Sequence, residues 1–457
     1  MRRSAERLNV PRRLSFALTT WGIGVRTTWI AFLLLMVFAS AARAQELPAA
    51  QQLAAGYPGD AIVGIDGNHV LVLWKENPLH STATWLVRRS SDGGRTFSEQ
   101  TAINLASDNG TDSASDGRRL HLCWVNYPDA IQHAYLDIHT GAISVAHQIQ
   151  NSGSRVTFCR VSARAGRVAV LWRDESASAA LVAHDLAVSV DGGDTFSKDI
   201  EIGWAFRSYA DARFSADGKL LHVVWGNEDL KETGTWYARV DPRTLTVQKQ
   251  QILPKPGTLP TIEATHNLVV VNSLASLAVS IDGGVTFRAV AEPSKKRPFT
   301  DPLSEAKNPE ARRESLPTVR VSLNNSSIYF VARDRDGNLY FSASHDAGLT
   351  LSEPQNLTGL SYPGSSVFGA TILHVGQKLV VAWSETVQGE WLAFRVSEDD
   401  GRTFQPLRKA PYKTRLFNRY AGFDVYAVGD ALLFIWSELN DSTRKLEGRI
   451  MYMRVVP

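Results

Sequence analysis

The sequence has 457 residues, of which 44% are apolar, 21% charged and 9% aromatic. This composition excludes a disordered chain, a collagen-like chain and a small domain held together by disulfides. The net charge is +3, but residues 1–44 contain seven arginines and one glutamate, so the rest of the chain has 42 basic and 45 acidic residues. Residues 45–457 have a net charge of −3 and show no excess of basic residues that would bind nucleic acid, so nucleic-acid binding is not expected.

Residues 1–44 are typical of an export signal peptide. Arginines precede an apolar stretch, WIAFLLLMVFASAA, that runs from Trp29 to Ala42. A stretch of about 14 residues is too short to cross a bilayer of about 30 Å as a helix, and Ala42-Arg43-Ala44 matches an A-x-A cleavage site. The sequence therefore predicts a mature chain, residues 45–457, that is exported to the periplasm or the medium and has no membrane span. An uncleaved N-terminal anchor is the alternative.

An apolar run of about five residues recurs eight times in the mature chain. The runs are VLVLW (70–74), LHLCW (120–124), VAVLW (168–172), LHVVW (221–225), LVVV (268–271), IYFVA (328–332), LVVAW (379–383) and LLFIW (432–436). They are short, rich in Val, Leu and Ile, and mostly preceded by a turn with Gly or Asn, which favours buried strands over helices. A repeat of about 50 residues is long enough for one four-stranded blade.

A second motif follows the strand run in most repeats. It reads SSDGGRTF around Asp92, SVDGGDTF around Asp191 and SIDGGVTF around Asp282, with weaker copies SHDAGLTL around Asp346 and SEDDGRTF around Asp399. The motif resembles the Asp box, S-x-D-x-G-x-T-[FW], of sialidase-like (BNR-repeat) β-propellers. Asp137 and Asp241 lie at the corresponding place in two further repeats and are interpreted as eroded copies.

The repeats predict an all-β fold: a single β-propeller of four-stranded blades. Eight strand runs indicate eight blades, and seven blades with one run misassigned is the alternative. The last repeat lacks a fourth strand because the chain ends at MYMRVVP, so we expect residues 45–58 to supply it and close the ring. Two smaller propellers fit less well because the period never breaks. The protein is expected to be a monomer.

The resemblance implies that the boxes are structural and face away from the working surface. On this basis Asp side chains that would otherwise be candidate carboxylates are assigned to turns. These residues are Asp92, Asp191, Asp282, Asp346 and Asp399.

Polar residues directly follow the strand-end tryptophans and should lie on the opposite face. They include Glu76, Asn126, Asp174, Glu228, Glu385 and Glu438, with Arg333 and Asp334 in the sixth repeat. A ring of carboxylates around a central funnel suits cation binding, polar-ligand binding or acid–base catalysis. The alternative is that a residue repeated in every blade has a structural role in every blade.

Residues that depart from the repeat are further candidates. A sialidase resemblance implies three arginines that grip a carboxylate, a Tyr nucleophile with a supporting Glu, and an Asp acid/base. The candidate catalytic residues are Glu314, Asp174, Glu228 and Tyr420, and the candidate ligand-binding residues are Arg207, Tyr209, Arg313, Arg333, Asp334 and Arg419. Sialidases also carry an Arg-Ile-Pro element near the mature N-terminus. No such triplet occurs in this sequence, which argues against sialidase activity itself.

The longest interval between turn motifs contains an insertion, residues 291–317. It is polar, charged and rich in proline, and it should join blade five to blade six on the presumed working face. Loops of this length are uncommon unless they are functional or disordered. The insertion is either a lid over an acidic ligand or a solvated tether.

Two cysteines remain after signal cleavage, Cys123 and Cys159. They either pair in an oxidising compartment or are two buried small apolar residues. The sequence contains no HExxH, CxxC pair, phosphate-binding loop or nucleophile elbow, so no metal and no cofactor are expected.

Three functions fit these observations. The first is an exported module that recognises glycan or protein ligands on one face. The second is a glycoside hydrolase of sialidase-like fold, and the third is an envelope assembly scaffold. Aromatic residues placed to stack on sugar rings include Trp204, Trp236, Tyr237 and Trp391, although they can equally serve packing between blades.

Overall fold

The structure is a computed structural model. It describes residues 47–56, 61–76, 84–105, 111–126, 130–151, 155–175, 181–206, 210–227, 233–253, 260–273, 276–290, 320–333, 337–359, 366–386, 390–411, 423–440 and 447–457. Residues 47–457 form one compact unit, and no α-helix occurs among the residues that are described.

The described strands form eight sheets of four strands, which we number as blades in chain order. Blade 1 contains β2 (Ile62–Asp66), β3 (His69–Glu76), β4 (Thr84–Ser90) and β5 (Thr101–Ile103). Blade 2 contains β6 (Asp112–Ser115), β7 (Arg119–Asn126), β8 (Ala130–Asp137) and β9 (His147–Asn151). Blade 3 contains β10 (Val156–Arg164), β11 (Arg167–Asp174), β12 (Leu181–Ser189) and β13 (Ile200–Phe206). Blade 4 contains β14 (Ala210–Phe214), β15 (Leu221–Asn227), β16 (Gly234–Val240) and β17 (Val247–Leu253).

The second half of the ring repeats this plan. Blade 5 contains β18 (Thr261–Ala264), β19 (Val269–Ser273), β20 (Ser276–Ser280) and β21 (Arg288–Ala289). Blade 6 contains β22 (Arg320–Asn324), β23 (Ser327–Arg333), β24 (Leu339–Ser344) and β25 (Gln355–Asn356). Blade 7 contains β26 (Ser366–Val375), β27 (Lys378–Thr386), β28 (Glu390–Ser397) and β29 (Arg408–Pro411). Blade 8 contains β30 (Phe423–Val428), β31 (Ala431–Asn440), β32 (Glu447–Val455) and β1 (Gln51–Gly56).

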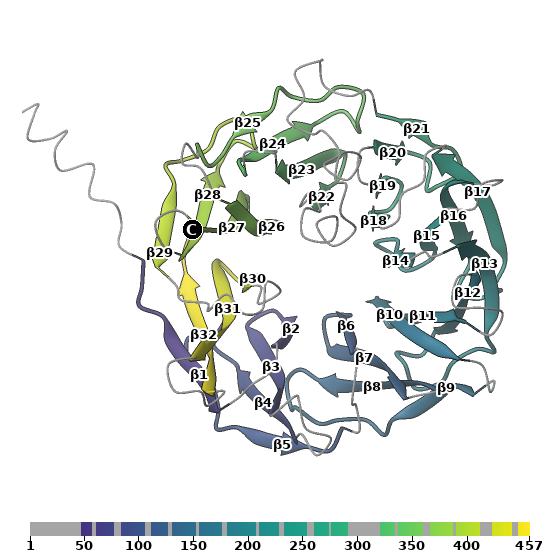
Figure 1. The fold of residues 1–457 in the computed structure, drawn as a ribbon, viewed down its shortest axis with the longest axis horizontal. Helices are drawn as coiled ribbons and strands as arrows, with labels where there is room; N and C mark the ends of the chain where they lie inside the picture. The colour runs from purple at the N-terminus through teal and green to yellow at the C-terminus, as the bar shows by residue number, and fades with distance from the viewer. Residues whose placement is uncertain are drawn as a thin grey trace, which may run out of the picture. The chain divides into compact units, whose positions relative to one another are not determined.

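The blades are arranged radially, with the first strand of each blade at the centre of the ring (Figure 1). The predicted all-β propeller of eight blades is confirmed, and the seven-blade alternative is wrong. Every neighbouring pair of strands within a blade is antiparallel, as in β2–β3 and β3–β4. The second strands read as continuous apolar runs because both sides of a blade pack against neighbouring blades: residues 70–75 of β3 are all buried.

The ring is closed by the N-terminal strand, as the sequence predicted. In blade 8, β1 pairs antiparallel with β32, and Gln51 lies opposite Tyr452. The Tyr452 hydroxyl donates a hydrogen bond of 2.6 Å to Gln51 Oε1. One sheet therefore contains both ends of the described chain, which protects the edge that the last three strands would otherwise expose.

The hydrophobic core is divided among the interfaces between blades. Between blades 2 and 3, for example, Val125 and Ile131 pack with Val170 and Trp172. The two cysteines lie in the same interface and form a disulfide, with a Cα–Cα distance of 6.4 Å between Cys123 and Cys159. This cross-link joins β7 to β10, so it fixes two blades to each other near the centre of the ring.

Each blade has two ends, which define two faces of the propeller. At one face lie the turns between the first and second strands and between the third and fourth strands. The five box motifs occupy the latter turns, so we call this the box face. The inner strands begin at the other face, where the second strands also end. We call it the opposite face.

Candidate functional site

The carboxylates of the five box motifs are engaged within their own turns. In the first box, Asp92 Oδ1 accepts hydrogen bonds from the Arg95 and Thr96 amides at 3.0 Å, and Oδ2 accepts one from the Thr96 hydroxyl at 2.6 Å. The Ser90 hydroxyl donates to Asp92 Oδ1 and accepts from the Gly94 amide. The Ser, Gly and Thr bonds recur around Asp191, Asp282, Asp346 and Asp399.

These bonds stabilise the charged form of the box carboxylates. The hydroxyl and amide of Thr286, with Ser280 and Val285, lower the pKa of Asp282 to about 2 against slight burial. A carboxylate with this pKa and no free oxygen is a poor proton donor near neutral pH. The two eroded copies keep part of this bonding: Asp137 accepts from the Thr140 amide and hydroxyl, and Asp241 accepts from the Arg243 amide.

The last glycine of each box contacts the preceding blade. A Cβ on Gly94 would lie 3.1 Å from the Leu433 side chain of blade 8, and one on Gly401 would lie 2.6 Å from Phe341 Cζ of blade 6. The box face is therefore built from turns that pack one blade against the next, and the box carboxylates stabilise those turns.

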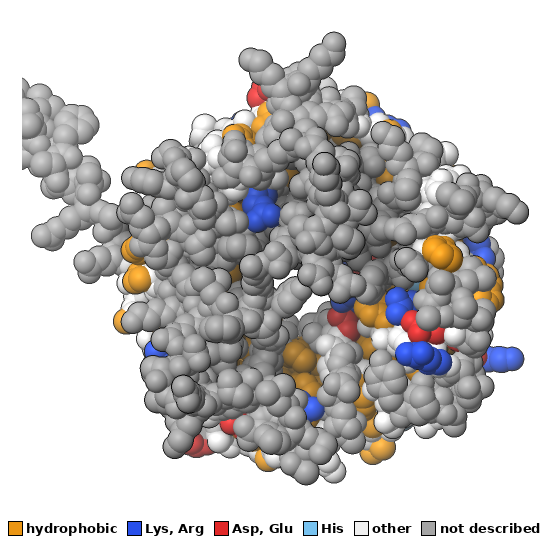
Figure 2. Space-filling model, in the orientation of Figure 1, with side chains coloured by type: hydrophobic (Ala, Val, Ile, Leu, Met, Phe, Trp, Pro, Cys, Tyr) orange, Lys and Arg blue, Asp and Glu red, His pale blue; other side chains and the backbone are white. Residues whose placement is uncertain are grey.

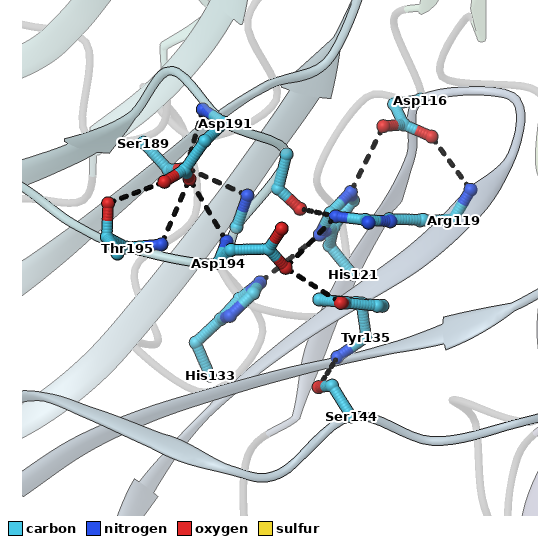
Figure 3. A network of polar contacts seen from close by, with 12 residues as sticks. Asp116, Arg119, His121, His133, Tyr135, Ser144, Ser189, Asp191, Asp194 and Thr195 are labelled. Carbon is cyan, nitrogen blue, oxygen red and sulfur yellow. Dashed lines mark hydrogen bonds and ion pairs between the residues drawn. The ribbon is translucent and has the colours of Figure 1, made fainter.

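Two buried histidines extend this packing between blades 2 and 3 (Figure 3). His121 Nδ1 and His133 Nε2 are 3.2 Å apart, and His121 Nε2 lies 3.4 Å from Asp116 Oδ2. Both rings are completely buried. Burial, with the neighbouring His121, lowers the pKa of His133 to about 3, so His133 is neutral at physiological pH. No substrate can reach this pair, and we assign it a structural role.

The rim of the same interface is polar. Tyr135 donates a hydrogen bond of 2.7 Å to Asp194 Oδ1, and Arg119 contacts the same oxygen at 3.3 Å (Figure 3). The Arg119 guanidinium also lies 4.1 Å from the centre of the Tyr135 ring. These contacts tie β7 and β8 of blade 2 to the box turn of blade 3.

Most of the candidate residues from the sequence lie outside the described residues. They are Glu314, Glu228, Tyr420, Arg207, Tyr209, Arg313, Asp334 and Arg419, together with the insertion 291–317. Of the candidates, Asp174 and Arg333 are described. Arg333 donates a hydrogen bond of 3.2 Å to the Val367 carbonyl of the next blade, which gives it a contact between blades 6 and 7.

Two members of the predicted carboxylate ring bond to the tryptophan two residues before them. Trp383 Nε1 donates to Glu385 at 2.9 Å, and Trp436 Nε1 donates to Glu438 at 3.0 Å. Each carboxylate also pairs with a cation of its own blade, Lys409 for Glu385 and Arg449 for Glu438. In blades 7 and 8 the repeated carboxylate therefore has the repeated structural role that the sequence left open.

Asp174 of blade 3 differs from these residues. It also follows a tryptophan by two positions, but no hydrogen-bond partner for Trp172 Nε1 lies in the described part of the chain. Its side chain is buried, and it lies on the same side of the sheet as Asp185 of β12. Burial and then the charges of Asp174, Asp199 and Glu201 raise the pKa of Asp185 to about 7.

Charged side chains alternate with buried apolar ones on an inner strand of the ring. In β14, Asp211 and Arg213 alternate with buried Ala210, Ala212 and Phe214. Asp211 Oδ1 lies 3.2 Å from Arg213 Nη1, and Asp211 Oδ2 accepts a hydrogen bond of 3.2 Å from the Ile262 amide of blade 5. The Arg213 side chain is 42% exposed and also lies 3.8 Å from Glu263.

The same arrangement joins blades 2 and 3. Asp112 Oδ2 accepts the Val161 amide at 2.8 Å, and its Oδ1 pairs with Arg160 at 2.9 Å. The Arg160 side chain is 47% exposed. At the opposite face of blade 3, Arg155 contacts buried Glu175 at 3.6 Å and remains largely exposed.

These pairs place both donors and acceptors around the centre of blades 2–5. The space-filling view shows a hollow near the middle of the ring, with acidic and basic side chains beside it (Figure 2). The sequence prediction missed Arg160, Arg213 and Glu263. A signal was present in the alternation A-D-A-R-F of residues 210–214, where charged residues take every second position of a short strand.

The described residues show neither a metal site nor a membrane span. No group of three or more His, Cys, Asp or Glu side chains in the described ranges is arranged to hold a metal ion. Within the same ranges, no helix has the length and apolar character needed to cross a bilayer.

Comparisons with known proteins found similarity to solved structures only. No protein-family model and no curated protein matches the sequence. Among solved structures, the chain is similar to a prolyl endopeptidase, with 14% identity and a TM-score of 0.47 over 90% of this chain and 58% of that chain. It is also similar to the β-propeller domain of the Trilobed protease from Pyrococcus furiosus, with 11% identity and a TM-score of 0.42 over 89% of this chain and 96% of that chain. A third is the NanB sialidase from Streptococcus pneumoniae, with 10% identity and a TM-score of 0.36 over 90% of this chain and 70% of that chain.

With TM-scores of 0.36 to 0.47, these similarities assign neither a family nor an activity to this chain. The chain spans less than two thirds of the length of the prolyl endopeptidase, 58%, and of the acylaminoacyl peptidase from Pyrococcus horikoshii, 59%. The activities of those proteins are therefore not transferred to this chain.

Proposed function

We propose that this protein is an exported β-propeller of the sialidase-like (BNR-repeat) type that binds a glycan at the centre of its opposite face. The five box sequences, in the turns between third and fourth strands, support the family assignment. The signal-like segment of residues 1–44 and the disulfide between Cys123 and Cys159 support export, because disulfides persist in oxidising compartments.

The observation that carries the proposal is the set of exposed arginines on the inner strands, each beside a carboxylate. Arg160 pairs with Asp112, and Arg213 pairs with Asp211. Guanidinium groups only donate hydrogen bonds and carboxylates only accept them. A sugar hydroxyl does both, so a surface with paired donors and acceptors matches a polyhydroxylated ligand better than a purely anionic or purely apolar one.

The box face is occupied by structural turns. The carboxylates of its five boxes are bonded to their own serine, threonine and amide donors, as described for Asp92. The last glycine of each box contacts the neighbouring blade. The structural role of these turns supports the opposite face as the working face.

The proposal is tested by screening the purified mature protein on a glycan array while hydrolysis of each bound glycan is followed in parallel. Saturable binding without product release is the expected result. Release of product would instead establish the glycoside hydrolase alternative. If no glycan binds, the carbohydrate proposal is wrong and the partner is to be sought among proteins.

A further inference from the structure

Asp185 is the one carboxylate at a position that is otherwise uncharged in every blade. This position lies on the third strand, directly opposite the strand-end tryptophan or its counterpart. Its eight occupants are Leu86, Gln132, Asp185, Trp236, Leu277, Tyr340, Ala393 and Met451. Because packing between blades is repeated around the ring, a charge introduced at one blade only is not explained by the fold.

The Asp185 carboxyl group has no counter-charge in the described part of the chain. The residue is 9% exposed, and no described hydrogen-bond donor or cation contacts its carboxyl group. Among the described residues, the charged groups that act on Asp185 are all acidic: Asp174 of β11, Glu201 of β13 and Asp199 just before β13. A buried carboxyl group surrounded by carboxylates creates a negative potential that favours a cation.

Exposed aromatic side chains lie on the same side of this sheet. Residues paired directly across antiparallel strands point to the same side, and Asp185 pairs with Glu201 while Ala183 pairs with Trp204. Trp204 is 41% exposed, and Phe206, paired with Leu181, is 36% exposed. On this register Asp185 and Trp204 are diagonal neighbours, which lie roughly 7–8 Å apart or less and within reach of an aromatic side chain.

A bulge in β13 brings Glu201 and Trp204 to the same side. The register shifts between Asp185 and His184, so Ile202 is the extra residue. Gly203 holds the bulge against blade 4, because a Cβ there would lie 2.7 Å from Trp225 Cζ2. Bulges of this kind change the direction of side chains and are common beside binding sites.

In Figure 2, hydrophobic, basic and acidic side chains lie uncovered beside one another in the region of blade 3.

We propose that Asp185, Glu201 and Trp204 form a binding site for an organic cation, an alkylammonium or guanidinium group, on the side of blade 3. The carboxylates supply the negative potential, and the indole face supplies a cation–π contact. A metal ion fits less well, because the described residues contain no group of three or more possible ligands and one wall is aromatic. This site is separate from the central one, so it does not depend on the glycan proposal.

Binding of a cation should release a proton from Asp185. A cation near Asp185 favours the ionised carboxylate, so below about pH 7 binding must displace the proton that the Asp185 carboxyl group carries in the unliganded protein. Affinity for a permanently charged cation should therefore increase by about tenfold from pH 6 to pH 8.

Isothermal titration calorimetry with N-acetyl-arginine amide tests the site, with N-acetyl-citrulline amide as the neutral isostere. We expect the arginine derivative to bind the wild-type protein and the citrulline derivative not to bind. Trp204→Ala should lower the affinity by about tenfold or more, consistent with a cation–π contact of about 1–2 kcal/mol. Asp185→Asn should weaken binding and abolish its pH dependence, whereas Glu99→Gln, an exposed change on the box face, should alter neither.

Titrations with glucosamine, which carries a cation, and with N-acetylglucosamine, which does not, form a second arm of the experiment. They distinguish an amino sugar from a basic side chain as the source of the cation. Trp204→Phe keeps an aromatic face and should retain most of the binding, which separates loss of the contact from loss of the fold. Equal binding of the arginine and citrulline derivatives would overturn the proposal. So would the absence of binding for both cations, or a pH dependence that persists in Asp185→Asn.

Discussion

The backbone of Gly193 in blade 3 packs directly against the imidazole ring of His133 in blade 2: a Cβ on residue 193 would lie 2.7 Å from His133 Cε1. Gly193 also has a φ of +89°, which residues with a Cβ rarely adopt. The second glycine of this box is thus required both by the turn and by the neighbouring blade.

Gly193→Ala should destabilise the protein by about 2–4 kcal/mol, because it adds backbone strain to a clash with a completely buried ring. Gly67→Ala is the matched control, because Gly67 has a φ of +57° and nothing within 4 Å of its Cβ position. That change should cost only about 1–2 kcal/mol. Urea unfolding measures both, and equal losses in the two variants would contradict the packing argument.

Ala347→Gly should stabilise the protein by about 0.5–1 kcal/mol. Ala347 takes the place of the first glycine of the box and has a φ of +55°, close to that of Gly93 at +75°. Glycine removes the steric cost of this conformation, partly offset by its larger entropy when unfolded. Ala289→Gly in strand β21 is the control and should destabilise. An Ala347→Gly variant that melts below the wild-type protein would show that the backbone strain is not relieved.

Stability should fall in two steps as the pH is lowered, and the first step belongs to buried histidines. Burial is the main cause that lowers the pKa of His133 and His184 to about 3 and of His222 to about 4. In the unfolded chain these groups have a pKa of about 6.5 and take up protons that the folded protein excludes. Their contribution to stability is present above about pH 6.5 and is lost as the pH falls from about 6.5 toward 3.

The second step belongs to the box carboxylates. Hydrogen bonds from the turn hold the pKa of Asp282 at about 2, below the value of 3.8 for the unfolded chain. The charged form is thus favoured by folding, and this contribution is present above pH 4 and lost between about pH 4 and 2. Thermal melts from pH 8 to pH 2 measure both steps. His222→Gln should reduce the first step and leave the second, and an unchanged first step would contradict the assignment.

Opening the disulfide should lower the free energy of unfolding by about 3–4 kcal/mol. Cys123 and Cys159 are 36 residues apart, and cross-linking a loop of that length restricts the unfolded chain by this amount. The double variant Cys123→Ala, Cys159→Ala should show the same loss without reductant. Wild-type protein that unfolds at the same urea concentration with and without reductant would show that the bond does not form.

The sequence was sufficient for the fold because every blade repeats the same local information. A run such as VLVLW at 70–74 specifies one strand, and a motif such as SSDGGRTF around Asp92 specifies one turn. Because the run occurs eight times, the number of blades could be counted from the sequence. The closing strand followed from simple counting, since the last repeat lacked one strand and residues 45–58 had no other partner.

The candidate site was less predictable because it depends on contacts between repeats. The sequence could not show that Cys159 of β10 faces Cys123 of β7, or that Asp185 shares a side of its sheet with Trp204. That second relationship depends on a bulge at Ile202, which a strict alternation of side chains does not reveal. The carboxylates that follow the tryptophans were visible in the sequence, but the Trp383–Glu385 bond became visible only in the structure.

The most direct test of the central claim is the affinity of the glycan that binds best on the array, measured for the wild type, Arg160→Gln, Arg213→Gln and Arg243→Gln. Arg160 and Arg213 project from inner strands, whereas Arg243 is exposed in a turn on the box face. The account predicts that each inner-strand variant weakens binding by about tenfold or more, as the loss of a charge-assisted hydrogen bond requires, and that Arg243→Gln has no effect. Unchanged affinity in both inner-strand variants, or a loss confined to Arg243→Gln, would contradict it.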